Sequence, residues 1–162
     1  MLHLIPPPLH RLAYRVTHRL RLRWWRLRKP LLIGCRVLAF DPQGRVLLVR
    51  HSYGNGKWMP PGGGISRGEA PLGAAIRELH EETGCLLIDA CAFGLVEEPL
   101  HGTINRVHLI TGSTSGEPKP DSREVIAAEF FSPHALPSEM TPNFAKVLPG
   151  WITAAKAALR RG

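Results

Sequence analysis

The sequence predicts an α+β fold or a mixed α/β/α layered fold. A length of 162 residues suits one domain with a hydrophobic core. Short apolar runs rich in β-branched residues, which indicate strands, stand both before and after one well-marked helix. Because a regular parallel fold would alternate strands and helices, this order instead favours a sheet with helices packed on it.

The first strands are predicted as a hairpin over residues 31–51. The runs "LLIGCRVLAF" and "RVLLVRH" are apolar, and the turn sequence "DPQG" joins them. A loop rich in glycine and proline, "SYGNGKWMPPGGG", follows. It leads to a helix over residues 71–83, with Pro71 at its first position and Gly84 just past its end.

The second half of the chain is predicted to return to strands. Strands are expected over 86–97 and 106–112, and the segment "EVIAAEFFS" is expected to form another after a polar loop. Short helices are expected to fill residues 133–160, with Pro149 breaking the last stretch.

The positive charge of the chain is concentrated at its N-terminus. The net charge is +8, and residues 1–30 contain eight Lys and Arg but no Asp or Glu, so residues 31–162 form a nearly neutral main domain. Residues 9–29 are predicted to form a basic amphipathic helix that ends at Pro30. Its apolar stripe could dock on this domain or on a second copy in a homodimer, it could lie on an anionic membrane surface, or its arginines could bind nucleic acid. The acid-free segment also resembles an organelle transit segment.

The cysteines and the hydropathy indicate an intracellular protein. Cys35, Cys85 and Cys91 lie among apolar neighbours without metal-type spacing, so they are expected to be buried free thiols in a reducing compartment. No apolar run approaches the roughly 18 residues of a membrane span. We therefore expect a cytoplasmic protein, with a peripheral membrane contact through the arm left open.

The predicted helix over 71–83 carries an unusual group of carboxylates. Glu78, Glu81 and Glu82 lie three and four residues apart, so they project from one side, about 5–6 Å from each other at Cβ. A divalent cation would relieve their repulsion, and Mg²⁺ prefers such oxygen ligands. The alternative is a solvated charged face. The buried stripe of the helix is expected to contain Leu72, Ile76, Leu79 and Thr83.

The spacing around these carboxylates resembles the Nudix box, G-x5-E-x7-R-E-U-x-E-E-x-G-U, where U is a bulky aliphatic residue. All seven fixed letters match between Gly63 and Gly84, and Cys85 replaces the final aliphatic residue. The flanks "WMPPGG" and "EVIAAEFFSPHALP" extend the resemblance over about residues 31–140. The resemblance implies the Nudix fold, which has a mixed β-sheet and a loop–helix–loop that carries the box.

The resemblance also implies roles for individual residues. Glu78, Glu81 and Glu82 would hold Mg²⁺ or Mn²⁺, often joined by the main-chain carbonyl of Gly62. Glu69 would orient Arg77. Glu124, whose match is looser, would supply a further ligand or the base, or would be an ordinary carboxylate at a strand edge.

The activity implied by the resemblance is hydrolysis of a nucleoside diphosphate linked to another moiety X. Glu78 or Glu124 would take the proton from water, with Glu81 and Glu82 mainly as ligands. Arg50 is predicted either to hold a phosphate or to be solvated, and Trp58 and Tyr53 to stack on a base, although Trp58 could instead pack the loop. The histidines, His51 among them, show no ligand spacing, and X is not identified by any motif. A rival interpretation is a nucleotide sensor whose arm binds membrane or nucleic acid.

Overall fold

The computed structural model describes residues 32–53, 55–100 and 103–161. The predicted N-terminal helix over 9–29 lies outside these residues. The elements are β1 (Leu32–Phe40), β2 (Val46–His51), β3 (Trp58–Met59), α2 (Pro71–Thr83), β4 (Ile88–Leu100), β5 (Thr103–Ser113), β6 (Val125–Phe131) and α3 (Pro142–Leu159).

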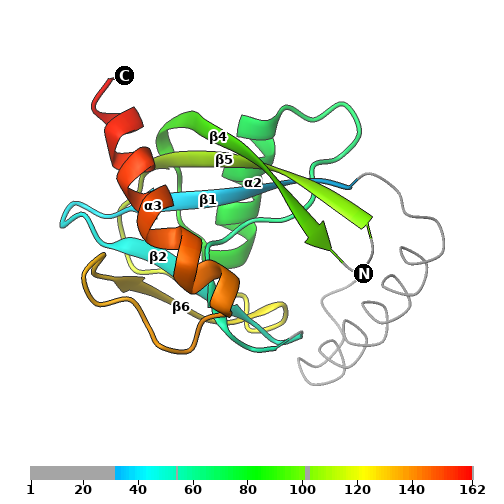
Figure 1. The fold of residues 1–162 in the computed structure, drawn as a ribbon. Coiled ribbons are helices and arrows are strands. Elements are labelled where there is room, and N and C mark those ends of the chain that lie inside the picture. The colour runs from blue at the N-terminus through cyan, green and yellow to red at the C-terminus, as the bar shows by residue number, and fades with distance from the viewer. Residues whose placement is uncertain (1–31, 54, 101–102, 162) are drawn as a thin grey trace.

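The strands form one mixed sheet, which confirms the predicted fold class. The order is β3-β2-β1-β5-β4, and β6 pairs with β2. Only β1 and β5 are parallel, over nine residue pairs from Leu32↔Asn105 to Phe40↔Ser113, and the other pairings are antiparallel. The helices α2 and α3 cover opposite faces of this sheet (Figure 1).

Both strands of the hairpin predicted over 31–51 are present, but they hardly pair with each other. The strands β1 and β2 pair at Phe40↔Val46 and then separate. The glycine loop takes the free edge of β1, because Cys35 N–H donates to the Gly63 carbonyl at 2.9 Å and Val37 N–H donates to the Pro61 carbonyl at 2.9 Å. The loop before α2 is thereby fixed to the centre of the sheet.

Two hydrophobic cores lie on the two faces of the sheet. Alternate residues of β1 face opposite sides, as expected for a strand. Cys35, Val37 and Ala39 pack in the core under α2, with Leu79. Leu38 and Phe40 pack in the core under α3.

The prediction for the buried stripe of α2 was half wrong. Leu79 and Thr83 are fully buried, but Leu72 and Ile76 are 37% and 40% exposed. The small side chains Ala74 and Ala75 face the sheet instead, together with Glu82. This rotation brings one carboxylate inward, where the apolar pattern predicted none.

The C-terminal region is one helix rather than several short ones. Thr141 caps α3, accepting from Phe144 N–H at 3.3 Å, and Pro149 lies inside the helix. Proline removes one helical hydrogen bond. The helix continues because a buried stripe packs it on the sheet on both sides of Pro149, formed by Phe144, Leu148, Ile152 and Ala155.

The cysteines are free, as expected. Cys35 and Cys85 are buried, whereas Cys91 is half-buried. Among the described helices, none combines the length and the apolar character needed to cross a membrane.

Candidate active site

Glycines at two positions let the loop approach both β1 and α2 closely. Gly62 has φ +140°, and a Cβ there would lie 2.2 Å from the Cys35 carbonyl oxygen. A Cβ at Gly63 would lie 2.6 Å from the Glu78 carboxylate. The two glycines therefore allow the loop backbone to approach both the sheet and the helix carboxylates.

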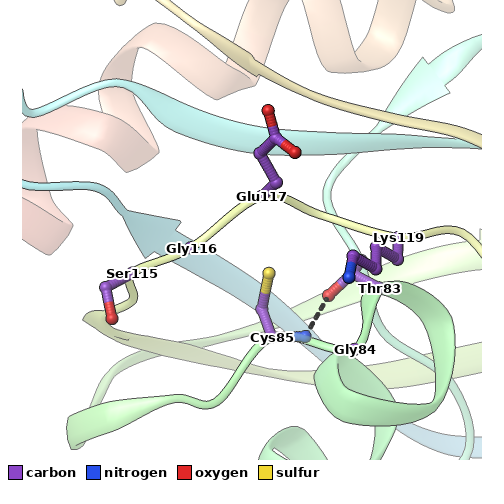
Figure 2. A pocket seen from close by; sticks show the side chains of 7 residues that line it. All are labelled: Thr83, Gly84, Cys85, Ser115, Gly116, Glu117 and Lys119. Atoms are coloured by element: carbon purple, nitrogen blue, oxygen red, sulfur yellow. Dashed lines mark hydrogen bonds between the residues drawn. The ribbon is translucent and has the colours of Figure 1, made fainter.

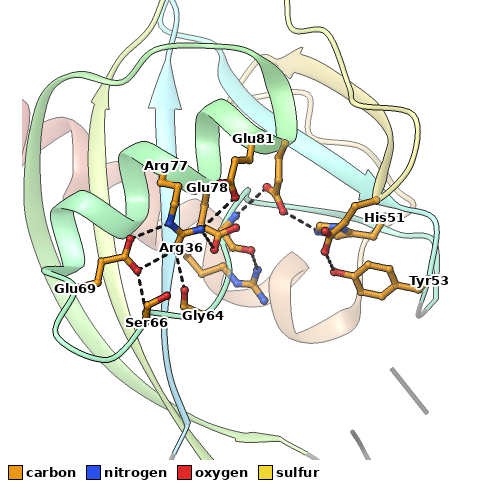
Figure 3. Close-up of polar contacts among 12 residues, drawn as sticks. Arg36, His51, Tyr53, Gly64, Ser66, Glu69, Arg77, Glu78 and Glu81 are labelled. Atoms are coloured by element: carbon orange, nitrogen blue, oxygen red, sulfur yellow. Dashed lines mark hydrogen bonds and ion pairs between the residues drawn. The ribbon is translucent and has the colours of Figure 1, made fainter. Parts of the chain in front are cut away.

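Arg77 joins the loop to the helix (Figure 3). Its guanidinium donates to both oxygens of Glu69, at 2.8 and 2.9 Å, and to the Gly64 carbonyl at 3.2 Å. It also donates to Glu78 at 2.7 Å and to Glu81 at 3.2 Å. The pairing of Arg77 with Glu69 is therefore present, and hydrogen bonds from Arg77 lower the pKa of the Glu69 carboxyl to about 2.

Glu82 is the most buried of the carboxylates on α2, with 6% of its surface exposed. Gly62 N–H donates to its Oε2 at 3.1 Å. Burial raises the pKa of Glu82 to about 8, and burial also raises the pKa of Glu78. Two adjacent carboxyls in a poorly hydrated place disfavour their own charge, so a cation among them would be bound favourably.

His51 belongs to this site, which the sequence did not indicate. Its Nε2 lies 3.5 Å from Glu82 Oε1, and its Nδ1 is buried without a hydrogen-bond partner among the described residues. Burial, and then the positive charge of Arg36, lower its pKa to about 4. His51 is therefore neutral at pH 7. Its distance of 31 residues from Glu82 along the chain explains why no local spacing revealed it.

Glu124, just before β6, belongs to the same group of carboxyls. Tyr53 Oη donates to Glu124 Oε1 at 2.6 Å, so the hydroxyl of Tyr53 contacts a carboxylate. The negative charge of Glu124 contributes to the raised pKa values of both Glu78 and Glu82, which shows that the three carboxyls share one electrostatic environment.

Arg36, on β1, is a second residue that sequence reasoning missed. Its Nη1 donates to the Gly62 carbonyl at 3.4 Å, and its guanidinium lies 5.5 Å from the centre of the Phe144 ring. No carboxylate forms an ion pair with it among the described residues, and its buried Nε has no partner there. It supplies positive charge beside Glu82.

Arg50 and Trp58, predicted to bind substrate, both make contacts within the protein. Arg50 donates to the Gly56 carbonyl at 3.0 Å, and its Nη1 lies 3.6 Å from Glu139. Trp58 is 6% exposed and packs edge-on against Phe131, with ring centres 4.9 Å apart. This burial favours the packing alternative for Trp58, and its contact with a base stays a prediction.

The donor chemistry of the site fits a hard divalent cation, but the side chains do not yet converge on one. Carboxylate and carbonyl oxygens are what Mg²⁺ and Mn²⁺ prefer. Within the described ranges, no three Asp, Glu, His or Cys side chains are grouped so that they could hold a metal ion. Glu78 and Glu81 are turned toward Arg77, and Glu82 toward Gly62. Binding of a divalent cation would therefore require these side chains to rotate.

A separate hollow lies beside the C-terminal end of α2 (Figure 2). It is lined by Thr83, Gly84, Cys85, Ser115, Gly116, Glu117 and Lys119. Lys119 N–H donates to the Thr83 carbonyl at 2.7 Å and closes one side of it. None of the box carboxylates lines this hollow, so it is not the candidate active site.

The raised pKa of Glu82 predicts that stability falls as the pH rises from about 6.5 to about 8. In this interval the folded chain keeps a proton on Glu82 (pKa about 8), whereas the unfolded chain, with an ordinary value near 4.5, has released it. Between about pH 4 and 6.5, His51 makes stability rise with pH, because its imidazole is protonated in the unfolded chain but not in the folded one. Glu78 adds to the effect of Glu82.

Urea unfolding in a metal chelator at pH 6.5, 7.2 and 8 measures this effect. The free energy of unfolding should decrease along the series, and Glu82→Gln should flatten the decrease. A wild-type stability that rises over the same interval would show that Glu82 is ionised in the folded chain.

A family model, two curated relatives and one solved structure resemble this chain. The family model described as NUDIX domain matches residues 30–151. A Bacillus subtilis (strain 168) protein, whose name proposes 8-oxo-dGTP diphosphatase activity, is 32% identical over 111 residues, covering 68% of this chain and 72% of that protein. An isopentenyl-diphosphate Delta-isomerase of Streptomyces griseus is 38% identical over 124 positions, covering 61% of this chain and 59% of the isomerase. The crystal structure of a MutT NUDIX hydrolase from Burkholderia pseudomallei superimposes with a TM-score of 0.63 at 25% identity, covering 81% of this chain and 97% of that one.

Proposed function

The chain belongs to the Nudix family, and from this premise we propose that it is a divalent-metal-dependent hydrolase. Its reaction would cleave the diphosphate linkage of a nucleoside diphosphate joined to another moiety X. The observation that carries the proposal is the loop–helix unit, in which Glu82 accepts from Gly62 N–H, Glu78 and Glu81 accept from Arg77, and Arg77 is bonded to Glu69. The diphosphatase name of the Bacillus subtilis relative and the hydrolase name of the superimposed structure support it, whereas the isomerase name supports only an enzyme that acts on a diphosphate.

The proposed ligands are Glu78, Glu81, Glu82, Glu124 and the Gly62 carbonyl, with Mg²⁺ or Mn²⁺ as the ion. When bound, the ion would neutralise the diphosphate and lower the pKa of a coordinated water. Glu82 is held in place by Gly62 N–H, and Arg77 fixes the end of the loop against the helix. These contacts fix the loop backbone relative to the helix before substrate arrives, so that only side chains have to rotate when the ion binds.

The general base is proposed to be Glu78, with Glu124 as the alternative. Burial raises the pKa of Glu78, and a base works best when its pKa approaches the working pH. The hydrogen bond from Arg77 lowers the pKa of Glu78, but the effect of burial is larger. Glu124 likewise has one oxygen bonded, to Tyr53 Oη, and stays the alternative.

The proposal leaves X open, and the relatives explain why. One relative's name contains 8-oxo-dGTP and the other's isopentenyl diphosphate, so only a diphosphate is common to them. The rival interpretation, a nucleotide sensor, is less favoured because a sensor does not need the full set of carboxylates that this chain retains.

The division at residue 30 and a role for the basic arm stay proposals. Deleting residues 1–30 tests them, with binding to anionic vesicles, binding to RNA and the oligomeric state measured for both forms. If vesicle or RNA binding survives the deletion, the arm is not the binding element. The cytoplasmic location also stays a prediction, with which three free cysteines agree.

The deciding experiment is a hydrolysis screen with Mg²⁺ and with Mn²⁺, with products identified by mass. The panel holds normal and oxidised nucleoside triphosphates, nucleotide sugars, dinucleoside polyphosphates and CDP-alcohols, with isopentenyl diphosphate to detect isomerisation. Cleavage within one diphosphate bridge, abolished by chelator, would support the proposal and identify X. Metal binding without any turnover would favour the sensor, and isomerisation without hydrolysis would contradict the reaction class.

A further inference from the structure

The residues that follow β2 hold those that precede β6, although they lie 71 residues apart in the chain. Ser52 N–H donates to the Glu124 carbonyl at 2.8 Å, and Ser52 Oγ donates to the Arg123 carbonyl at 2.8 Å. Tyr53 Oη donates to Glu124 Oε1 at 2.6 Å. Glu124 is therefore anchored through its backbone by one residue and through its carboxylate by the next.

The turn before β6 reinforces this anchor from the other side. The Asp121 carboxylate accepts from the backbone N–H groups of Arg123, Glu124 and Val125, at 3.0, 3.0 and 2.9 Å. Such a side chain–backbone turn fixes the local backbone. The direction in which the Glu124 side chain leaves the main chain is thus set before any ligand is bound.

The same end of β2 also reaches the helix carboxylates. His51 Nε2 lies 3.5 Å from Glu82 Oε1, and the rings of His51 and Tyr53 are 5.0 Å apart (Figure 3). Adjacent residues of one segment therefore contact Glu82 on α2 and Glu124 before β6. This segment spans the site and sets the separation of the two carboxylates.

We propose that Tyr53 is a positioning residue that presents the Glu124 carboxylate to the carboxylates of α2. The phenol occupies Oε1, which leaves Oε2 as the oxygen available to a cation. An anchored carboxylate has less rotational entropy to lose on binding than a freely rotating one. This inference rests on the proposed function, because it gives Glu124 the role of an oxygen ligand.

The test is Tyr53→Phe in the full chain, which removes the hydroxyl and keeps the ring. Mn²⁺ binding without substrate, followed by calorimetry, should weaken about tenfold, as is usual when a partner of a metal ligand is lost. Glu124→Asp breaks the same contact from the other side and should weaken binding similarly. The matched control is Thr153→Ala, which removes a hydroxyl bonded to the Pro149 carbonyl on α3 and away from this anchor, and Mn²⁺ binding should then change less than twofold.

A double variant separates positioning from general stability. If Tyr53 acts through Glu124, adding Tyr53→Phe to Glu124→Gln should weaken Mn²⁺ binding no further. Independent losses in the double variant, or an unchanged affinity in Tyr53→Phe with a normal unfolding midpoint, would overturn the inference. Glu124→Gln without any effect on Mn²⁺ would also overturn it, yet would leave the proposed function intact if Glu82→Gln still abolished binding. Binding unaffected by both glutamines would reject the metal site itself.

Discussion

Replacing Glu82 with glutamine should abolish metal-dependent hydrolysis while the fold remains intact. Glutamine has nearly the same shape, and its amide oxygen can still accept the hydrogen bond from Gly62 N–H. It lacks the negative charge that would bind the cation. A bound metal supplies several kcal/mol of transition-state stabilisation, so kcat should fall on the order of a thousandfold.

Steady-state kinetics and an unfolding curve in chelator check this expectation together. Glu129→Gln is the matched control, because Glu129 is an exposed glutamate on β6, away from the box. The activity of this control variant should equal that of the wild type. The Glu82 variant should unfold no earlier than the wild type, because it removes a buried carboxyl rather than a packed apolar group. Full activity in Glu82→Gln would remove the central ligand from the proposal.

Gly62→Ala should damage stability and activity together. The added Cβ would lie 2.2 Å from the Cys35 carbonyl oxygen and 3.0 Å from Arg36 Cα, both of which are backbone atoms of a central strand. The residue also has φ +140°, where an L side chain is strained by about 1–3 kcal/mol. Because the loop must move off β1, we expect a loss of at least about 2 kcal/mol in the free energy of unfolding.

The activity should fall by about a hundredfold in the same variant. Gly62 N–H orients Glu82, and a displacement near 1 Å in a catalytic group can have an effect of that size. Gly64→Ala is the control, because its Cβ would meet no atom within 4 Å and its φ is not in the left-handed region. Chemical denaturation should place Gly64→Ala within about 0.5 kcal/mol of the wild type. Equal stability of the two variants would show that the loop does not depend on close contact with β1.

The sequence alone determined the features that depend on short-range geometry. The helix over 71–83 was predicted at both ends, because Pro71 suits the first helical turn and Gly84 adopts the left-handed conformation, φ +70°, that ends it. The spacing of the box carboxylates and the pairing of Arg77 with Glu69 also followed from the sequence and its family resemblance, because one loop and one helix hold them all.

Local patterns were misleading where packing decides between alternatives. Ile76 matches the apolar period of α2 but is exposed, whereas Glu82 is buried, because the glycine loop covers that side of the helix. Pro149 indicated a break, yet the buried stripe of α3 holds the helix through it. Arg50 and Trp58, predicted to bind substrate, also make contacts that no local pattern indicated, with the Gly56 carbonyl and the Phe131 ring.

The parts of the site that come from distant segments were decided only by the tertiary structure. The amino-acid order determined the helix, its caps and the carboxylates on it, because residues three or four apart on a helix are neighbours in any fold. It could not reveal that β1 pairs with β5 and leaves an edge for the glycine loop, or that His51 and Tyr53 meet Glu82 and Glu124. Those contacts join residues 31 to 73 positions apart, and a strand's local sequence states its conformation without stating its partner.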